Sequence, residues 1–107
     1  MSYRTLVVDD SEFQRTVVAD TLDDRFRVID RAKNGKEAVS KFDELAPEVV
    51  TMDVVMPEMT GVEALKAIKD RSPETVVVMC TSVEQKEKMR EAARAGADGY
   101  VTKPISK

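Results

Sequence analysis

Five side chains of the kinds that handle phosphate groups and metal ions each follow a short apolar run of the sequence. They are Asp9, Asp10, Asp53, Thr81 and Lys103. If these runs are neighbouring strands of a parallel sheet, their carboxyl ends meet at the edge where such sheets bind ligands. Three carboxylates, a hydroxyl and an ammonium would then share one crevice.

Three ionised carboxylates in one crevice repel one another. Two charges about 4 Å apart cost on the order of 4 kcal/mol at an effective dielectric constant near 20. Lys103 would offset part of that repulsion, but a hard divalent cation suits an all-oxygen cluster better. Zinc is disfavoured, because the chain has no histidine and only one cysteine, Cys80. We therefore expect one Mg²⁺ ion as the cofactor.

Asp53 is the candidate nucleophile, because carboxylates form aspartyl-phosphate intermediates. Phosphoryl transfer needs mainly positioning and charge stabilisation, which Lys103 and the hydroxyl of Thr81 would supply. Each residue alone has a simpler interpretation. Asp9 or Asp10 alone could cap a helix, Asp53 could start a turn, Thr81 could cap the next helix, and Lys103 could be solvated. Their joint placement favours the site.

The elements that must position these residues are short, valine-rich segments alternating with longer amphipathic ones. Segments of the first kind, apolar on both faces, are typical of buried parallel strands. Five strands alternating with four helices predict an α/β, doubly wound parallel sheet. The predicted strands are 5–8, 27–29, 48–52, 75–80 and 99–102.

Capping signals predict where the helices begin and end. Capping-box patterns, one of them a close variant, precede the amphipathic segments, and proline or glycine follows them. The patterns are Ser11…Gln14, Asn34…Glu37, Thr60…Glu63 and Ser82…Gln85, and the end signals are Pro47, Pro73 and Gly96.

Composition restricts the function classes. The 107 residues fit one domain, 1–107, and the net charge of −3 argues against direct nucleic-acid binding. A single cysteine permits no internal disulfide, which favours a reduced, cytoplasmic setting. The sequence has no signal-peptide run and no apolar stretch near the roughly 20 residues that cross a bilayer, so no membrane association is expected.

Four segments resemble the receiver domains of response regulators in two-component systems, and the resemblance runs nearly end to end. It is closest to the CheY-like, chemotaxis type, including the receiver of chemotaxis methylesterases. The segments are 6–11 (LVVDDS), 52–61 (MDVVMPEMTG), 81–82 (TS) and 99–104 (GYVTKP).

The resemblance implies a flavodoxin-like strand order, 2-1-3-4-5. It also implies that Asp53 accepts the phosphoryl group. Asp10, Asp53 and the backbone carbonyl of Val55 would bind Mg²⁺ directly, and Asp9 would bind it through water. Thr81 would move to bond the phosphoryl group, Tyr100 would rotate as the switch aromatic, and Lys103 would pair with the phosphoryl group. The Lys103–Pro104 peptide would be cis.

The resemblance implies a phosphorylation-activated switch rather than a stand-alone enzyme, with self-catalysed transfer and slow autodephosphorylation only. The implied partners are a sensor histidine kinase and a protein target, such as a flagellar or archaellar switch or an effector domain. The family normally has a fifth helix, which is not found before Lys107. We therefore expect an apolar patch near Val17, Val18, Thr21 and Leu22, and self-association through it.

Three alternatives remain at this point. The chain could be the receiver of a longer effector, either a methylesterase or a transcription regulator. It could be an inert docking domain, although the complete set of acids, Thr81 and Lys103 argues against that. It could be a Mg²⁺-dependent phosphohydrolase of the haloacid-dehalogenase class. That class has an acid two residues after its nucleophile, where this chain has Val55.

Overall fold

The computed structural model describes residues 2–22, 24–56, 59–82 and 85–102, and these form one five-stranded sheet flanked by four helices. All neighbouring strands pair in parallel, in the order β2-β1-β3-β4-β5. The predicted fold class and strand order are therefore confirmed. The strands are β1 (Tyr3–Val8), β2 (Phe26–Ala32), β3 (Val49–Asp53), β4 (Val76–Thr81) and β5 (Gly99–Thr102).

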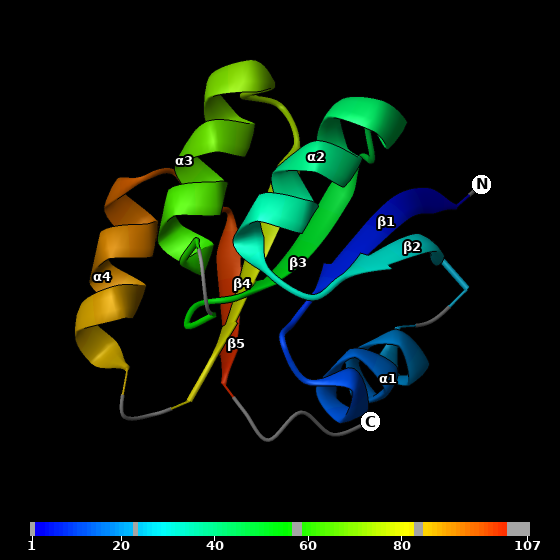
Figure 1. Cartoon of the computed structure of the whole chain (residues 1–107), viewed down its shortest axis with the longest axis horizontal. Coiled ribbons are helices and arrows are strands. Elements are labelled where there is room, and N and C mark those ends of the chain that lie inside the picture. Colours follow the sequence, from blue (N-terminus) through cyan, green and yellow to red (C-terminus); the bar gives the residue numbers. More distant parts are fainter. Residues whose placement is uncertain (1, 23, 57–58, 83–84, 103–107) are drawn as a thin grey trace.

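The helices cover the two faces of the sheet unequally. Three of them lie on one face and only α1 lies on the other (Figure 1). No helix follows β5 within the part of the chain that the structure describes. The helices are α1 (Glu12–Thr21), α2 (Gly35–Leu45), α3 (Gly61–Arg71) and α4 (Lys86–Arg94).

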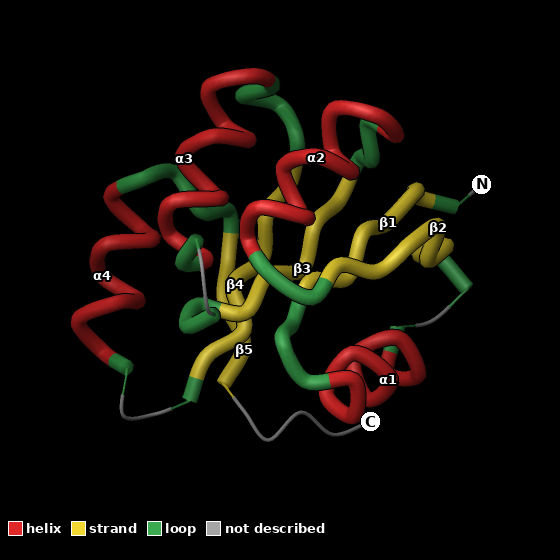
Figure 2. The backbone as a smooth tube through the Cα atoms, in the orientation of Figure 1, coloured by secondary structure: helices red, strands yellow, loops and turns green. Residues whose placement is uncertain are grey.

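The central strands carry the core, and the two edge strands do not. Every residue of β3 is buried, whereas β2 and β5 are mostly half-buried or exposed. Strands β2 and β5 are the edge strands of the sheet (Figure 2). The prediction of mostly apolar, buried strands therefore holds for the central strands and not for these two. The largest fully buried apolar side chains come from β1, β3, β4 and α3, and include Leu6, Met52, Leu65, Ile68 and Met79.

Two strands end one residue later than predicted. Parallel pairing continues as far as Asp53 opposite Cys80 and Thr81 opposite Thr102. Both side chains of interest are therefore the last residues of strands rather than the first residues of loops. This matters for the site, because a residue in a hydrogen-bonded ladder is held more rigidly than a residue in a loop.

Three of the four predicted capping patterns are confirmed. The side chains of Ser11 and Asn34 accept hydrogen bonds from the third residue of their helices, and Thr60 and Glu63 form a complete reciprocal capping box. The Ser82 prediction is wrong. Helix α4 begins later, with Gln85 as its N-cap residue and no capping side-chain hydrogen bond, and Ser82 supplies only its backbone carbonyl to the Gln85 N–H.

An apolar groove of about 200 Å³ opens on the sheet face beside α1. The predicted patch residues Val18, Thr21 and Leu22 line it, whereas Val17 is half-buried and does not. The hydroxyl oxygen of Thr51 lies in the groove region, buried and without a hydrogen-bond partner among the described residues. Self-association through this face stays a prediction.

Within the described residues, no helix combines the length and the apolar character that crossing a membrane requires.

Candidate metal centre

The turn from β1 into α1 places two adjacent carboxylates differently. Asp9 is 1% exposed, its N–H donates to the carbonyl of Ala32 at 3.0 Å, and its Oδ1 accepts from the N–H of Ser11 at 3.0 Å. The neighbouring side chain, Asp10, is exposed. The turn therefore fixes one carboxylate inside the molecule and presents the other at its surface.

Asp53 ends the central strand β3 and is 8% exposed. The start of α3 packs directly on the backbone that follows it. The Gly61 N–H donates to the carbonyl of Val54 at 2.8 Å, and a Cβ added to Gly61 would lie 2.0 Å from the carbonyl oxygen of Asp53. Only glycine permits this close approach, so Gly61 allows α3 to hold the strand end that carries Asp53.

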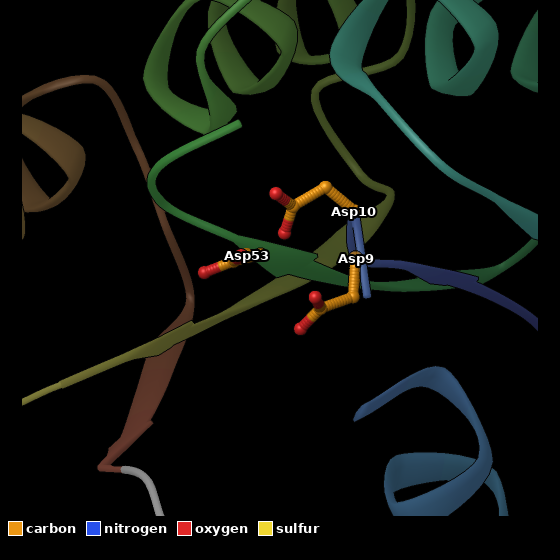
Figure 3. Close-up of side chains that lie close together, drawn as sticks. All are labelled: Asp9, Asp10 and Asp53. Carbon is orange, nitrogen blue, oxygen red and sulfur yellow. The ribbon is translucent and has the colours of Figure 1, made fainter. Parts of the chain in front are cut away.

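The three carboxylates meet at the carboxyl edge of the sheet, as predicted. Asp9, Asp10 and Asp53 each offer an oxygen, and these oxygens lie within 4.8 Å of one another (Figure 3). Two of the three residues are buried and one is exposed, so the cluster is accessible from solvent on one side. A set made only of carboxylate oxygens suits a hard divalent cation such as Mg²⁺, which the site could bind with water completing its shell.

The remaining predicted site residues differ in burial. Thr81 is 1% exposed and its hydroxyl donates to the carbonyl of Ser82 at 3.3 Å. Val55 is half-exposed, two residues after Asp53. Tyr100 is 61% exposed and lines a shallow hollow with residues of α4. Lys103, and with it the Lys103–Pro104 peptide, lies outside the described residues.

One residue at this edge was missed from the sequence. Arg15, on the first turns of α1, donates from Nη1 to the carbonyl of Asp9 at 2.6 Å. Its spacing of four residues from the predicted cap, Ser11, puts it on the same side of the helix and was the available signal. That spacing does not by itself reveal a bond to the preceding turn, because the bond depends on how the turn folds back over α1.

Comparison with known proteins agrees with this geometry. The family profile described as "Response regulator receiver domain" matches residues 5–107. The chain belongs to this family. A chemotaxis protein CheY of Halobacterium salinarum is 47% identical over 107 residues, which cover all of this chain and 89% of that protein.

Solved receiver domains have the same fold. The response regulator domain of Thermotoga maritima CheB is 43% identical, with a TM-score of 0.89 over 99% of this chain and 84% of that one. CheY in a CheX–CheY–BeF₃–Mg²⁺ complex from Borrelia burgdorferi is 28% identical, with a TM-score of 0.89 over 97% of this chain and 80% of that one. The chain is thus similar to receivers of both the CheY and the CheB type.

Proposed function

We propose that this receiver domain, residues 1–107, accepts a phosphoryl group on Asp53 with the help of Mg²⁺ and signals the change by protein contact. The observation that carries the proposal is the convergence of three carboxylate oxygens within 4.8 Å at the end of the central strand. Such a cluster is costly to a fold. Its retention favours a function that uses the negative charge.

Asp53 is the proposed nucleophile because, of the three acids, it is the one that ends a strand, the central strand β3. One of its carboxylate oxygens forms a bond to phosphorus, while the bond from phosphorus to the donor breaks and its electron pair leaves with the donor. When bound, the cation would offset the charge of the acids and of the transferred group. Asp10, Asp53 and the carbonyl of Val55 would hold it directly, and Asp9 would hold it through water.

The proposed switch uses the buried hydroxyl of Thr81. Its hydrogen bond to the carbonyl of Ser82 is long, at 3.3 Å, for a hydroxyl donor. A phosphoryl oxygen on Asp53 would be a stronger, charged acceptor, so we propose that Thr81 turns toward it. Lys103 would pair with another phosphoryl oxygen. Tyr100, exposed on β5 beside α4, would then report the change to a partner.

The relatives suggest the partners. Because the chain resembles CheY proteins over most of their length, we propose a chemotaxis role. The donor would be a sensor histidine kinase, and the target a flagellar or archaellar switch protein. The chain covers 89% of the Halobacterium salinarum CheY relative but only 30% of a methylesterase relative from Thermotoga maritima, which favours this role over the alternative of a receiver that controls an effector domain.

Intact-mass measurement after treatment with acetyl phosphate and Mg²⁺ tests the proposal. The wild type should gain the mass of one phosphoryl group, and Asp53→Asn should gain none. Asp20→Asn, which neutralises an exposed acid of α1, is the matched control and should react like the wild type. An adduct that persists in Asp53→Asn would place the nucleophile elsewhere.

A further inference from the structure

Arg15 binds the β1–α1 turn at two points. Its side-chain Nη1 donates to the carbonyl of Asp9 at 2.6 Å, and its backbone N–H donates to the carbonyl of Ser11 at 2.9 Å. These two carbonyls lie on either side of Asp10 in the sequence. One residue of α1 thus holds the backbone both before and after the exposed acid of the metal centre.

The first of these bonds, to the carbonyl of Asp9, fixes the orientation of the peptide that joins Asp9 to Asp10. The carbonyl of Asp9 and the N–H of Asp10 belong to one planar peptide unit, so fixing the direction of the carbonyl fixes the orientation of the whole unit. The opposite side of Asp9 is held as well, because its N–H donates to the carbonyl of Ala32 at 3.0 Å. This backbone sets the direction in which the Cα–Cβ bond of the exposed Asp10 points.

We propose that Arg15 is a positioning residue of the metal centre, which aims the Asp10 carboxylate at the cation by fixing the Asp9–Asp10 peptide. The inference rests on the proposed Mg²⁺ site. Groups that orient metal ligands without touching the metal typically contribute 10- to 100-fold to metal affinity. We therefore expect Mg²⁺ to bind about tenfold more weakly when the bond to the Asp9 carbonyl is removed.

The sign of the effect separates positioning from simple charge. A guanidinium near a cation site repels the cation, so removing it would strengthen Mg²⁺ binding if charge were its only influence. Removing a positioning bond does the opposite. Arg15→Met tests this cleanly, because methionine keeps an unbranched stem and a similar helix propensity but has neither a donor nor a charge. Arg15→Lys keeps the charge and one donor and should recover part of the affinity.

Calorimetric titration of the unphosphorylated protein with Mg²⁺ gives the affinity, and urea unfolding without Mg²⁺ gives the stability. Ser11→Ala is the matched structural control. It removes the cap of α1, which costs about 1 kcal/mol, but leaves the bond from Arg15 to the Asp9 carbonyl intact. Ser11→Ala should lower stability with little change in Mg²⁺ affinity, whereas Arg15→Met should weaken Mg²⁺ binding with a smaller loss of stability.

A double mutant decides whether Arg15 acts through Asp10. In an Asp10→Asn background, Arg15→Met should weaken Mg²⁺ binding by less than twofold, because the ligand that it positions is gone. A tenfold loss in both backgrounds, or wild-type or tighter binding by Arg15→Met, would overturn the inference while leaving the metal site in place. Unchanged binding by Asp10→Asn alone would instead overturn the metal site itself.

Discussion

At the carboxyl ends of β1 and β3, three carboxylates lie within 4.8 Å of one another, whereas near the amino end of β4 a carboxylate meets an ammonium. There the Nζ of Lys69 donates to Oδ2 of Asp98 at 2.7 Å and to the carbonyl of Thr75 at 2.6 Å. The same Oδ2 accepts from the N–H of Val77 at 2.8 Å. Opposite charges join α3, β4 and the segment before β5 at this end.

Other cations at the amino end serve structure in the same way. Arg4 donates to the carbonyls of Leu45 and Ala46, at 2.7 and 2.9 Å, and so caps the end of α2. Arg71 pairs with Asp43 across α2 and α3 at 2.7 Å. Opposite charges thus pair at the amino end, where they stabilise the fold, whereas like charges gather at the carboxyl end, where they repel one another. Removing a charged group should therefore lower stability at the amino end and, without a bound cation, raise it at the carboxyl end.

The largest effect should come from Gly61→Ala at the carboxyl end. The new Cβ would lie 2.0 Å from the carbonyl oxygen of Asp53, so either α3 or the end of β3 must move. We expect a loss of about 3 kcal/mol of unfolding free energy, as for severe overpacking, with reduced phosphorylation of the folded fraction. Urea unfolding measures the first quantity and intact mass the second.

Gly96→Ala is the control for Gly61→Ala. Gly96 has a φ of +103°, but its nearest neighbour would be 3.8 Å from the new Cβ. It should cost only about 1 kcal/mol, from backbone strain, and leave phosphorylation unchanged. If the two variants lost equal unfolding free energy, the close packing of Gly61 against Asp53 would not explain the effect of Gly61→Ala.

Lys69→Met should have the next largest effect, a loss of about 2 kcal/mol. The substitution removes a half-buried ammonium from the carbonyl of Thr75 and from Asp98, leaving both acceptors with fewer donors. Urea unfolding at neutral pH checks it. Lys66→Met, at an exposed position of the same helix, is the control and should change stability by less than about 0.5 kcal/mol.

The Lys69–Asp98 pair should also make the stability depend on pH in the acid range. Burial raises the pKa of Asp98, but the hydrogen bond from Lys69 and the Val77 N–H more than offset it, and the pKa falls below its ordinary value of 3.8. A lowered pKa contributes stability that is present above 3.8 and lost as the pH falls through the folded-state pKa. Lys69→Met should therefore flatten this acid-induced loss. An unchanged slope of stability below pH 4 would contradict the assignment.

The smallest effect should be a gain. Asp10→Asn removes one of three mutually repelling charges at an exposed position, so stability without Mg²⁺ at low salt should rise by about 0.5 kcal/mol. With saturating Mg²⁺ the order should reverse, because at the proposed site the wild type would bind the ion more tightly and gain more stability from it. Thermal unfolding in EDTA and in Mg²⁺ measures both signs. If Asp10→Asn were less stable than the wild type in EDTA, repulsion among the three carboxylates would not be destabilising the fold.

Much of the fold could be predicted because its signals are local. Short, valine-rich apolar runs indicated the strands and their order along the chain, and three capping patterns located the starts of α1, α2 and α3. The start of α4 was misplaced because Ser82 follows a strand and has the pattern of a cap without acting as one. Local patterns cannot tell where a strand stops pairing, so the ends of β3 and β4 were each one residue short.

The sequence by itself determined which chemistry was available: three acids, a hydroxyl and a lysine after apolar runs, with no histidine in the chain. Tertiary structure decided what holds the described part of that chemistry in place. The contacts of Gly61 with Asp53 and of Arg15 with the Asp9 carbonyl depend on how separate elements pack. So does the Lys69–Asp98 pair that stabilises the opposite end of the sheet. Residue type and spacing encode periodicity and capping, but a contact between elements depends on distances that only the folded chain defines.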